Sequence, residues 1–229
     1  MELLQNGFTL DIPSGQFPLS TDSVLLSHFV TLKKNDAVLD LGSGCGTLGL
    51  LLCAKHPSCT VTGIELSPDA HNAALENIRQ NGLQARLFSI CGDLRAIPQE
   101  IKPGSFDICL SNPPYFSGGP ASASNPSARH TDFCNAEDLF RSASYGLKWG
   151  GDFYLVHKPE ALGELCGWAV KFGLEPKVLR LVRHDRNKPV SLILLKCRKG
   201  AKPGLKWEEL CLRTESGEPT DEYREIYHL

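Results

Sequence analysis

The chain has 229 residues, a formal net charge of −2 and 41% hydrophobic residues, which suits one domain with a sizeable core. No apolar run reaches the ~18 residues of a membrane span, and the N-terminus lacks the basic and apolar regions of a secretory signal, so we expect a cytoplasmic protein without a membrane partner. The nine cysteines are scattered and form no C-x-x-C pair, so reduced thiols and no metal site are expected.

Strand-like runs alternate with helical segments along most of the chain. Helices are expected at Thr21–Thr31, Thr47–Lys55, Pro68–Asn81, Ala136–Leu147 and Pro159–Phe172. Strands are expected at Ala37–Leu41, Cys59–Glu65, Ala85–Ile90, Phe106–Ser111, Asp152–Val156, Lys177–Arg183 and Val190–Lys196. This alternation predicts an α/β fold: a seven-stranded, mostly parallel sheet with helices on both faces. The loop His184–Pro189 is too short for a crossover helix, so the last strand should be antiparallel to the one before it.

One domain is expected over residues 1–229. Its parts are an N-terminal lead-in and helix at 1–35, a core at 36–200 and an acidic C-terminal extension at 201–229.

A glycine-rich loop follows the first strand in the stretch AVLDLGSGCGTLGL. Gly42, Gly44 and Gly46 come after a strand and open a helix, where a ligand can approach the backbone closely. Glu65 ends the next strand, at the spacing expected of a ribose-binding acid. The run G-C-G-T-L-G also satisfies the dinucleotide pattern, so a nucleotide-binding oxidoreductase or an inactive binding module stays open. Asp40, however, would repel a pyrophosphate, and it suits a ligand that carries a cation.

The fourth strand runs into the tetrad Asn112-Pro113-Pro114-Tyr115. In open α/β sheets ligands bind beyond the carboxyl ends of the strands, so this tetrad should face the same crevice as the glycine loop. Asn112 can accept a hydrogen bond from one N–H of a flat amine, and the Pro113 carbonyl, held by the stiff Pro-Pro unit, can accept from the other. The Tyr115 ring can stack on a planar substrate while its hydroxyl is expected to be spare. The tetrad therefore predicts a clamp for a flat amine group.

The pattern D-x-G-x-G-x-G resembles the first motif of the class I S-adenosylmethionine-dependent methyltransferases, which are Rossmann-like. That resemblance implies S-adenosylmethionine as the cofactor, with Asp40 near its methionine end. It implies that Glu65 binds the ribose hydroxyls and that Asp93 approaches the adenine amine. Leu66, Leu94 and Asn112 are expected among the further cofactor-binding residues.

Three stretches are similar to the bacterial tRNA(Val) adenine-N6 methyltransferase family: the lead-in QNGFTLDIPSGQFPLSTDSVLLSHF, the middle SNPPYF with SARH, and the tail LRTESGEPTDEYREIYHL. In that family a Thr-Asp pair, here Thr21-Asp22, precedes a helix beside the cofactor. The resemblance implies N6-methylation of adenine 37 in a valine tRNA, with tRNA as the partner. A protein glutamine or other amine N-methyltransferase would use the same clamp and stays open as the alternative.

The net charge gives no global attraction to nucleic acid. The segment Lys177–Lys206 is locally basic, and it forms either a phosphate-binding face or a solvated surface. The loop 116–135 is long enough to be expected either functional or mobile. Its residues Arg129 and His130 are either RNA contacts or exposed loop residues.

Overall fold

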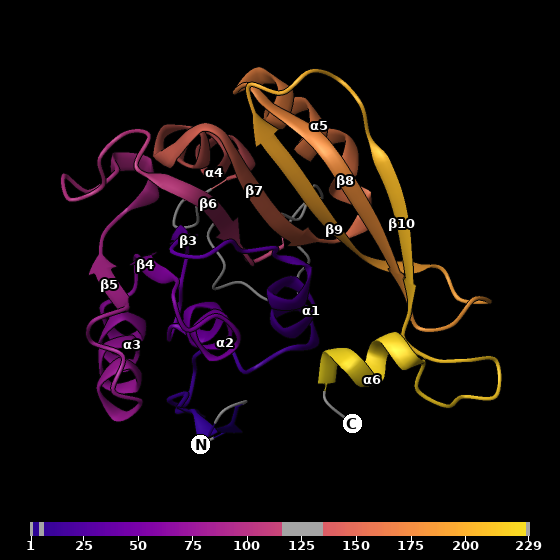
Figure 1. Ribbon diagram of the computed structural model, residues 1–229, viewed down its shortest axis with the longest axis horizontal. Coiled ribbons are helices and arrows are strands. Elements are labelled where there is room, and N and C mark those ends of the chain that lie inside the picture. Colours follow the sequence, from indigo (N-terminus) through magenta and orange to yellow (C-terminus); the bar gives the residue numbers. More distant parts are fainter. Residues whose placement is uncertain (1, 5–6, 116–134, 228–229) are drawn as a thin grey trace, which may run out of the picture.

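The computed structural model describes residues 2–4, 7–115 and 135–227 of the chain. Its centre is an eight-stranded sheet in the order β10-β8-β9-β7-β6-β3-β4-β5 (Figure 1). The strands of this sheet are β3 (Ala37–Leu41), β4 (Thr60–Glu65), β5 (Leu87–Cys91), β6 (Phe106–Ser111), β7 (Leu147–His157), β8 (Leu174–Arg183), β9 (Val190–Lys199) and β10 (Lys206–Cys211). A separate two-stranded ribbon of β1 (Glu2–Leu3) and β2 (Thr9–Leu10) belongs to the lead-in.

Strand direction places several strand ends at one edge of the sheet. Neighbouring strands are parallel from β5 through β4, β3 and β6 to β7. Strand β9 is antiparallel to both β7 and β8, which confirms the prediction for the last two expected strands. The carboxyl ends of β3, β4 and β6 therefore lie side by side, and this is where an open α/β sheet binds its ligands.

Helices cover both faces of the sheet, as predicted. They are α1 (Thr21–Phe29), α2 (Thr47–Lys55), α3 (Pro68–Gln80), α4 (Ala136–Gly146), α5 (Leu162–Lys171) and α6 (Asp221–Tyr227), with short 3₁₀ turns at Leu94–Ala96 and Pro159–Ala161. Helices α1, α2, α3 and α6 lie on one side of the sheet and helices α4 and α5 on the other (Figure 1). Their buried side chains belong to two separate core clusters, one on each face. Within the described ranges no helix is long and apolar enough to cross a bilayer.

The two faces of the core follow from the alternation of side chains along each strand. In β3, Val38 joins the core on the α2 side, whereas Leu39 and Leu41 join the core on the α4 side. Asp40 lies between these two leucines in the strand and points to the same face as Val38. A carboxyl group is thereby built into the buried part of the central strand.

The C-terminal segment contributes two elements that the sequence did not predict, β10 and α6. Seven strands were expected, and the described residues form an eighth, β10, which pairs in parallel with β8 at the sheet edge. Its sequence, KWEELC, contains lysine and glutamate, which are depleted in strands. Contacts with β8 stabilise this strand despite its low β-propensity. Glu208 lies directly opposite Arg180 in the register, and the two side chains form an ion pair of 2.6 Å.

Candidate active site

A cavity of about 660 Å³ opens at the carboxyl ends of β3, β4 and β6. The residues predicted for the site that line it are Asp22, Gly42, Gly44, Glu65, Leu66, Asp93, Leu94, Asn112, Pro113, Pro114 and Tyr115. Thr21, Asp40 and Gly46 were also predicted, and they are not part of the lining. The cavity thus brings the glycine loop and the N-P-P-Y tetrad into one space, as the sequence predicted.

The glycine loop is tied to the end of β4 by Glu65. The backbone N–H of Gly44 donates to Oε2 of Glu65 at 2.8 Å, and the N–H of Ser67 donates to Oε1 at 2.8 Å. Gly44 has a positive φ of 54°, which favours glycine, and a Cβ added there would meet open space. Each oxygen of Glu65 keeps a lone pair after these two contacts. The carboxylate is therefore fixed in direction and still able to accept from hydroxyl groups in the cavity.

Asp40 is a buried carboxyl group without a partner. It is 1% exposed, and neither of its oxygens has a hydrogen-bond partner among the described residues. Burial, and secondly the negative charge of Glu65, raises the pKa of Asp40 from 3.8 to about 8. A buried polar group normally has a partner, so this carboxyl group is explained best by a cationic group that arrives with a ligand.

The first turn of α1 holds both polar members of the tetrad. The Asn112 side chain donates from Nδ2 to Oγ of Ser23 at 3.0 Å, and the Tyr115 hydroxyl donates to Oδ2 of Asp22. Burial raises the pKa of Asp22, and the nearby charge of Lys158 lowers it part of the way back. The expectation that the Tyr115 hydroxyl is spare was wrong, because a residue 93 positions earlier in the chain takes it up.

The Tyr115 ring has two further neighbours at the end of β7. His157 packs edge-on against it, with ring centroids 5.1 Å apart, and the Lys158 ammonium lies 4.9 Å from the ring centroid. His157 is buried, and this burial lowers its pKa. Lys158 is exposed and forms no ion pair within residues 2–4, 7–115 and 135–227. A positive charge therefore lies over the aromatic ring of the tetrad.

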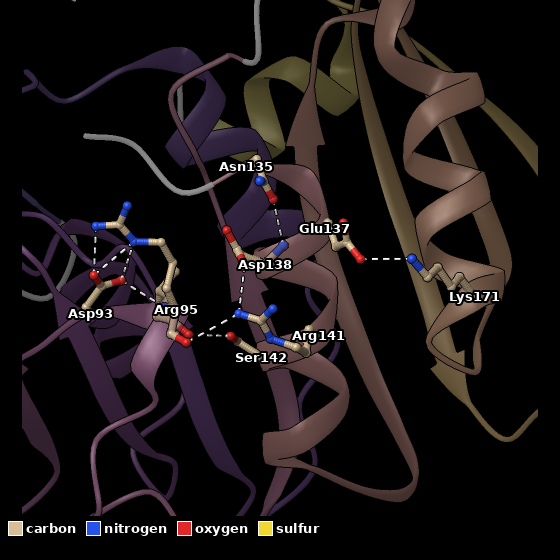
Figure 2. A network of polar contacts seen from close by, with 9 residues as sticks. Asp93, Arg95, Asn135, Glu137, Asp138, Arg141, Ser142 and Lys171 are labelled. Carbon is tan, nitrogen blue, oxygen red and sulfur yellow. Dashed lines mark hydrogen bonds and ion pairs between the residues drawn. The ribbon is translucent and has the colours of Figure 1, made fainter. Parts of the chain in front are cut away.

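Asp93 lies at the cavity edge in an ion pair with Arg95, whose Nη2 is 2.8 Å from Oδ2 (Figure 2). Asp93 also caps the 3₁₀ turn that begins at Leu94. Two side chains of helix α4 bind the backbone of this turn. Ser142 donates to the Leu94 carbonyl at 2.9 Å, and Arg141 donates to the Arg95 carbonyl at 3.4 Å (Figure 2). The turn is thus firmly placed beside the cavity, while the Asp93 carboxylate is already engaged by a cation.

Half of the basic residues in the segment Lys177–Lys206 form ion pairs within the fold. Its ion pairs are Arg180 with Glu208 and Glu222, Arg183 with Glu209, Lys196 and Arg198 with Asp152, and Lys206 with Glu208. The acidic C-terminal segment supplies most of these partners. In the part of the chain that the structure describes, Lys177, Arg186, Lys188, Lys199 and Lys202 form no such pair. Lys177 and Lys199 donate to backbone carbonyls instead, so about half of the expected positive charge has no acidic partner. The loop residues Arg129 and His130 lie outside the described residues.

The sequence did not predict Ser23, His157 and Lys158, which contact the tetrad, or Phe17, which lines the cavity. Phe17 lines the cavity and is 77% exposed. Ser23 lies directly after the Thr-Asp pair and three residues after the N-cap of α1, Ser20, a spacing that could have marked it as part of the first helical turn. Lys158 follows β7, the strand next to β6, and only the strand order reveals that it is near Tyr115.

The sheet order, the glycine loop with its acid at the next strand end, and the tetrad in one cavity define the class of a Rossmann-like methyltransferase. The chain belongs to the methyltransferase small domain family, whose model matches residues 20–164. It is 34% identical to a protein of Shewanella halifaxensis over 69% of this chain and 65% of that relative. It is 31% identical to a protein of Photobacterium profundum over 87% of this chain and 85% of that one. Both relatives are named tRNA1(Val) (adenine(37)-N6)-methyltransferase.

Among solved structures, the crystal structure of a predicted O-methyltransferase from Agrobacterium tumefaciens superposes with a TM-score of 0.75 at 20% identity, covering 91% of this chain and 96% of that one. At this identity the likeness concerns the fold alone. Together with the sequence relatives it confirms the expected Rossmann-like methyltransferase fold and the family resemblance.

Proposed function

We propose that the protein is an S-adenosylmethionine-dependent methyltransferase that modifies N6 of an adenine in tRNA, adenine 37 of a valine tRNA being the specific target. The observation that carries this proposal is the single cavity lined by both a ribose-accepting carboxylate, Glu65, and an amine clamp, Asn112 with Pro113. Next to the lining residue Leu41, Asp40 is a buried carboxyl group without a partner among the described residues. The target is supported by the relatives, whose name specifies this nucleoside and this tRNA.

The residues present fit the cofactor. When bound, S-adenosylmethionine supplies an electrophilic methyl group on a sulfonium. Glu65, oriented by two backbone N–H groups, accepts hydrogen bonds from the ribose hydroxyls. Asp40 has no partner among the described residues. The cationic methionine end would lower the pKa of Asp40 on binding, so that the carboxyl group ionises and pairs with the cation. A dinucleotide would bring an anionic pyrophosphate to the glycine loop and no cation for the unpartnered Asp40, so the oxidoreductase alternative has no support in this geometry.

Asn112 and Pro113 act on the substrate amine. Because Asn112 donates from Nδ2 to Ser23, its carbonyl oxygen is left as the acceptor for one amine hydrogen. The Pro113 backbone carbonyl accepts the other, and the adjacent Pro114 limits its movement. Holding both hydrogens turns the nitrogen lone pair out of conjugation and towards the cavity. The nitrogen releases its proton to solvent after it has reacted, so no strong base is required of the protein.

Tyr115 holds the base and Lys158 meets the nucleic acid. An adenine within a structured loop must leave its stack before N6 can be reached, and stacking on an aromatic ring contributes about 1–3 kcal/mol per base. The ring of Tyr115 is fixed by Asp22 and His157, so it is ready to receive the base. Lys158 lies over the same ring and is exposed, which suits it to the phosphate beside the extruded nucleotide.

A methylation assay on total tRNA prepared without modifications tests this function, with analysis of the product nucleosides. We expect N6-methyladenosine, mapped to adenine 37 of valine tRNA, and no product from the same tRNA carrying guanine 37. A peptide substrate containing glutamine serves as the parallel arm. If the peptide is methylated on glutamine and the tRNA gains no methyl group, the protein acts on a protein substrate and the assignment to RNA is wrong. If tRNA is methylated at another nucleoside, the assigned target is wrong.

A further inference from the structure

We propose that Ser23 is a positioning residue that sets the direction of the Asn112 amide and thereby makes the clamp selective for a six-amino purine over a six-oxo purine. The inference rests on the proposed function for its substrate, and it goes beyond that function in assigning a residue of α1 to base discrimination.

The contact with Ser23 gives the two ends of the Asn112 amide different roles. Nδ2 donates to Oγ of Ser23 at 3.0 Å, while Oδ1 has no hydrogen-bond partner among the described residues. Asn112 lines the cavity and is half-buried. With its nitrogen committed to α1, the amide presents its oxygen to the cavity. An oxygen is the end required to accept from an amine, because Nδ2 can only donate.

The Ser23 hydroxyl can accept a hydrogen bond from Asn112 because another oxygen, that of Ser20, is placed to accept its proton. The side chain of Ser20 caps α1 and accepts from the Ser23 backbone N–H at 3.3 Å. The hydroxyl oxygens of Ser20 and Ser23 are also 3.3 Å apart. Ser23 can therefore donate its one hydroxyl proton to Ser20 and keep its lone pairs for Nδ2 of Asn112. Because Ser23 is only 6% exposed, bulk water has little access to compete for this contact.

The neighbouring residue supports the other end of the tetrad in the same way. Asp22 accepts from the Tyr115 hydroxyl, so two consecutive residues of α1 hold the amide and the ring. The capped first turn of α1 is thus the frame on which the clamp is aligned. Asp22 fixes where the base stacks, whereas Ser23 fixes which hydrogen-bonding group the base must present.

Discrimination follows from the direction of the amide. Adenine offers an amine hydrogen to Oδ1, whereas hypoxanthine and guanine offer a carbonyl oxygen at the same ring position, and two acceptors repel each other. Without the Ser23 hydroxyl, the amide loses the contact that holds Nδ2 on the helix side and can rotate by about 180° to present it. A site that hydrogen-bonds one group rejects an analogue lacking it far better than an unpatterned site does. Ser23→Ala should therefore slow methylation and relax the choice of base.

The test compares Ser23→Ala and Ser23→Thr with wild type and with Ser27→Ala. Ser27 lies in the same helix and is also buried. It donates to the Val24 carbonyl and accepts from Lys55, and it has no hydrogen bond to Asn112. The first readout is the single-turnover methylation rate with valine tRNA. The second is the ratio of dissociation constants for the same tRNA carrying inosine 37 or adenine 37. Affinity for S-adenosylhomocysteine, measured by calorimetry, shows that the cofactor half of the site is intact.

We expect Ser23→Ala to lose roughly 10- to 100-fold in rate, as small misplacements of reacting groups do, with cofactor affinity unchanged. The preference for adenine over inosine should shrink by a similar factor, Ser23→Thr should recover most of both, and Ser27→Ala should match wild type. A wild-type rate in Ser23→Ala, or an unchanged inosine-to-adenine ratio, would overturn the inference while leaving the proposed function standing.

A second measurement does not depend on RNA. In ¹⁵N-labelled protein the side-chain NH₂ of Asn112, identified by its loss in Asn112→Asp, should exchange with water much faster in Ser23→Ala than in wild type or Ser27→Ala. Wild type that fails to methylate any tRNA would refute the proposed function and with it the base selectivity, and equal exchange rates in all variants would refute the positioning by Ser23.

Discussion

Replacing Asp40 by asparagine should remove a steep pH dependence from the stability of the ligand-free protein. The pKa of Asp40 is raised from 3.8 to about 8, first by burial and then by Glu65. Between these values the folded state retains a proton that the unfolded state has released. The stabilising contribution is therefore complete below pH 3.8 and is lost as the pH rises through about 8.

The size of the effect follows from the shift. One pKa unit corresponds to about 1.4 kcal/mol, so Asp40 should reduce the free energy of unfolding by roughly 4 kcal/mol between pH 3.8 and pH 7. Asparagine does not titrate. Its amide would be buried at the same position without hydrogen-bond partners, which lowers the free energy of unfolding by about 1–3 kcal/mol at every pH. The difference in stability between variant and wild type should consequently grow with pH by up to about 1.4 kcal/mol per unit, in favour of the variant.

Urea unfolding of both proteins at pH 5, 6, 7 and 8 measures this difference, and the other titrating groups cancel in the comparison. Stability curves that stay parallel across this range would show that Asp40 is not a buried carboxyl with a raised pKa, and the reasoning about its missing partner would fail. Calorimetry at pH 8 measures the effect of the same substitution on cofactor binding. S-adenosylmethionine should bind Asp40→Asn roughly 10-fold more weakly, equivalent to about 1.4 kcal/mol, because the cation then meets a neutral amide.

Three further predictions concern the cavity. Glu65→Ala should weaken S-adenosylmethionine binding by roughly 1.5–3 kcal/mol, the range for hydrogen bonds to a charged group, and unchanged calorimetric affinity would remove Glu65 from the site. Tyr115→Phe should lower the single-turnover rate by about 10-fold, because the ring loses the bond to Asp22 that orients it; a wild-type rate would mean that packing alone fixes the ring. Lys158→Gln should reduce the slope of log affinity for tRNA against log salt by about 0.7–0.9, one phosphate contact, with the exposed Lys34→Gln as the matched control, and equal slopes in the two variants would place the phosphate contacts elsewhere.

Local sequence signals were sufficient for the sheet core and its helices. The strands Ala37–Leu41 and Phe106–Ser111 and the helix Thr47–Lys55 were predicted with the bounds that the structure has, because each is a short apolar run closed by glycine, proline or polar residues. Helix α3 was predicted from its cap, and Ser67 does accept from the Ala70 N–H. Strand β10 escaped prediction because its charges match partners on β8, a relation that exists only once the strands are paired.

For the site as well, the sequence predicted the features that depend on local spacing and missed the contacts between distant segments. Motifs at the strand ends indicated the glycine loop, Glu65 and the tetrad, since their spacing within each βα unit is local. The sequence could not show that Asp22 pairs with Tyr115 or Ser23 with Asn112, because both contacts join segments about 90 residues apart, 93 and 89 positions respectively. Nor could it show that Arg180 is shared by Glu208 and Glu222. Basic and acidic segments that look independent along the chain form ion pairs with each other in the fold.

The most direct test of the central claim, that Asn112 holds the amine of an adenine for methylation, is the single-turnover rate of Asn112→Ala on unmodified valine tRNA at saturating cofactor. The amide acts mainly when positive charge grows on the amine hydrogens, so its loss should lower the rate far more than it weakens tRNA binding. We predict a fall of about 10²–10³, the effect of removing one preorganised hydrogen-bonding group, and partial activity in Asn112→Asp, whose carboxylate can still accept. A rate for Asn112→Ala close to that of wild type would contradict the amine clamp and with it the assignment of the tetrad.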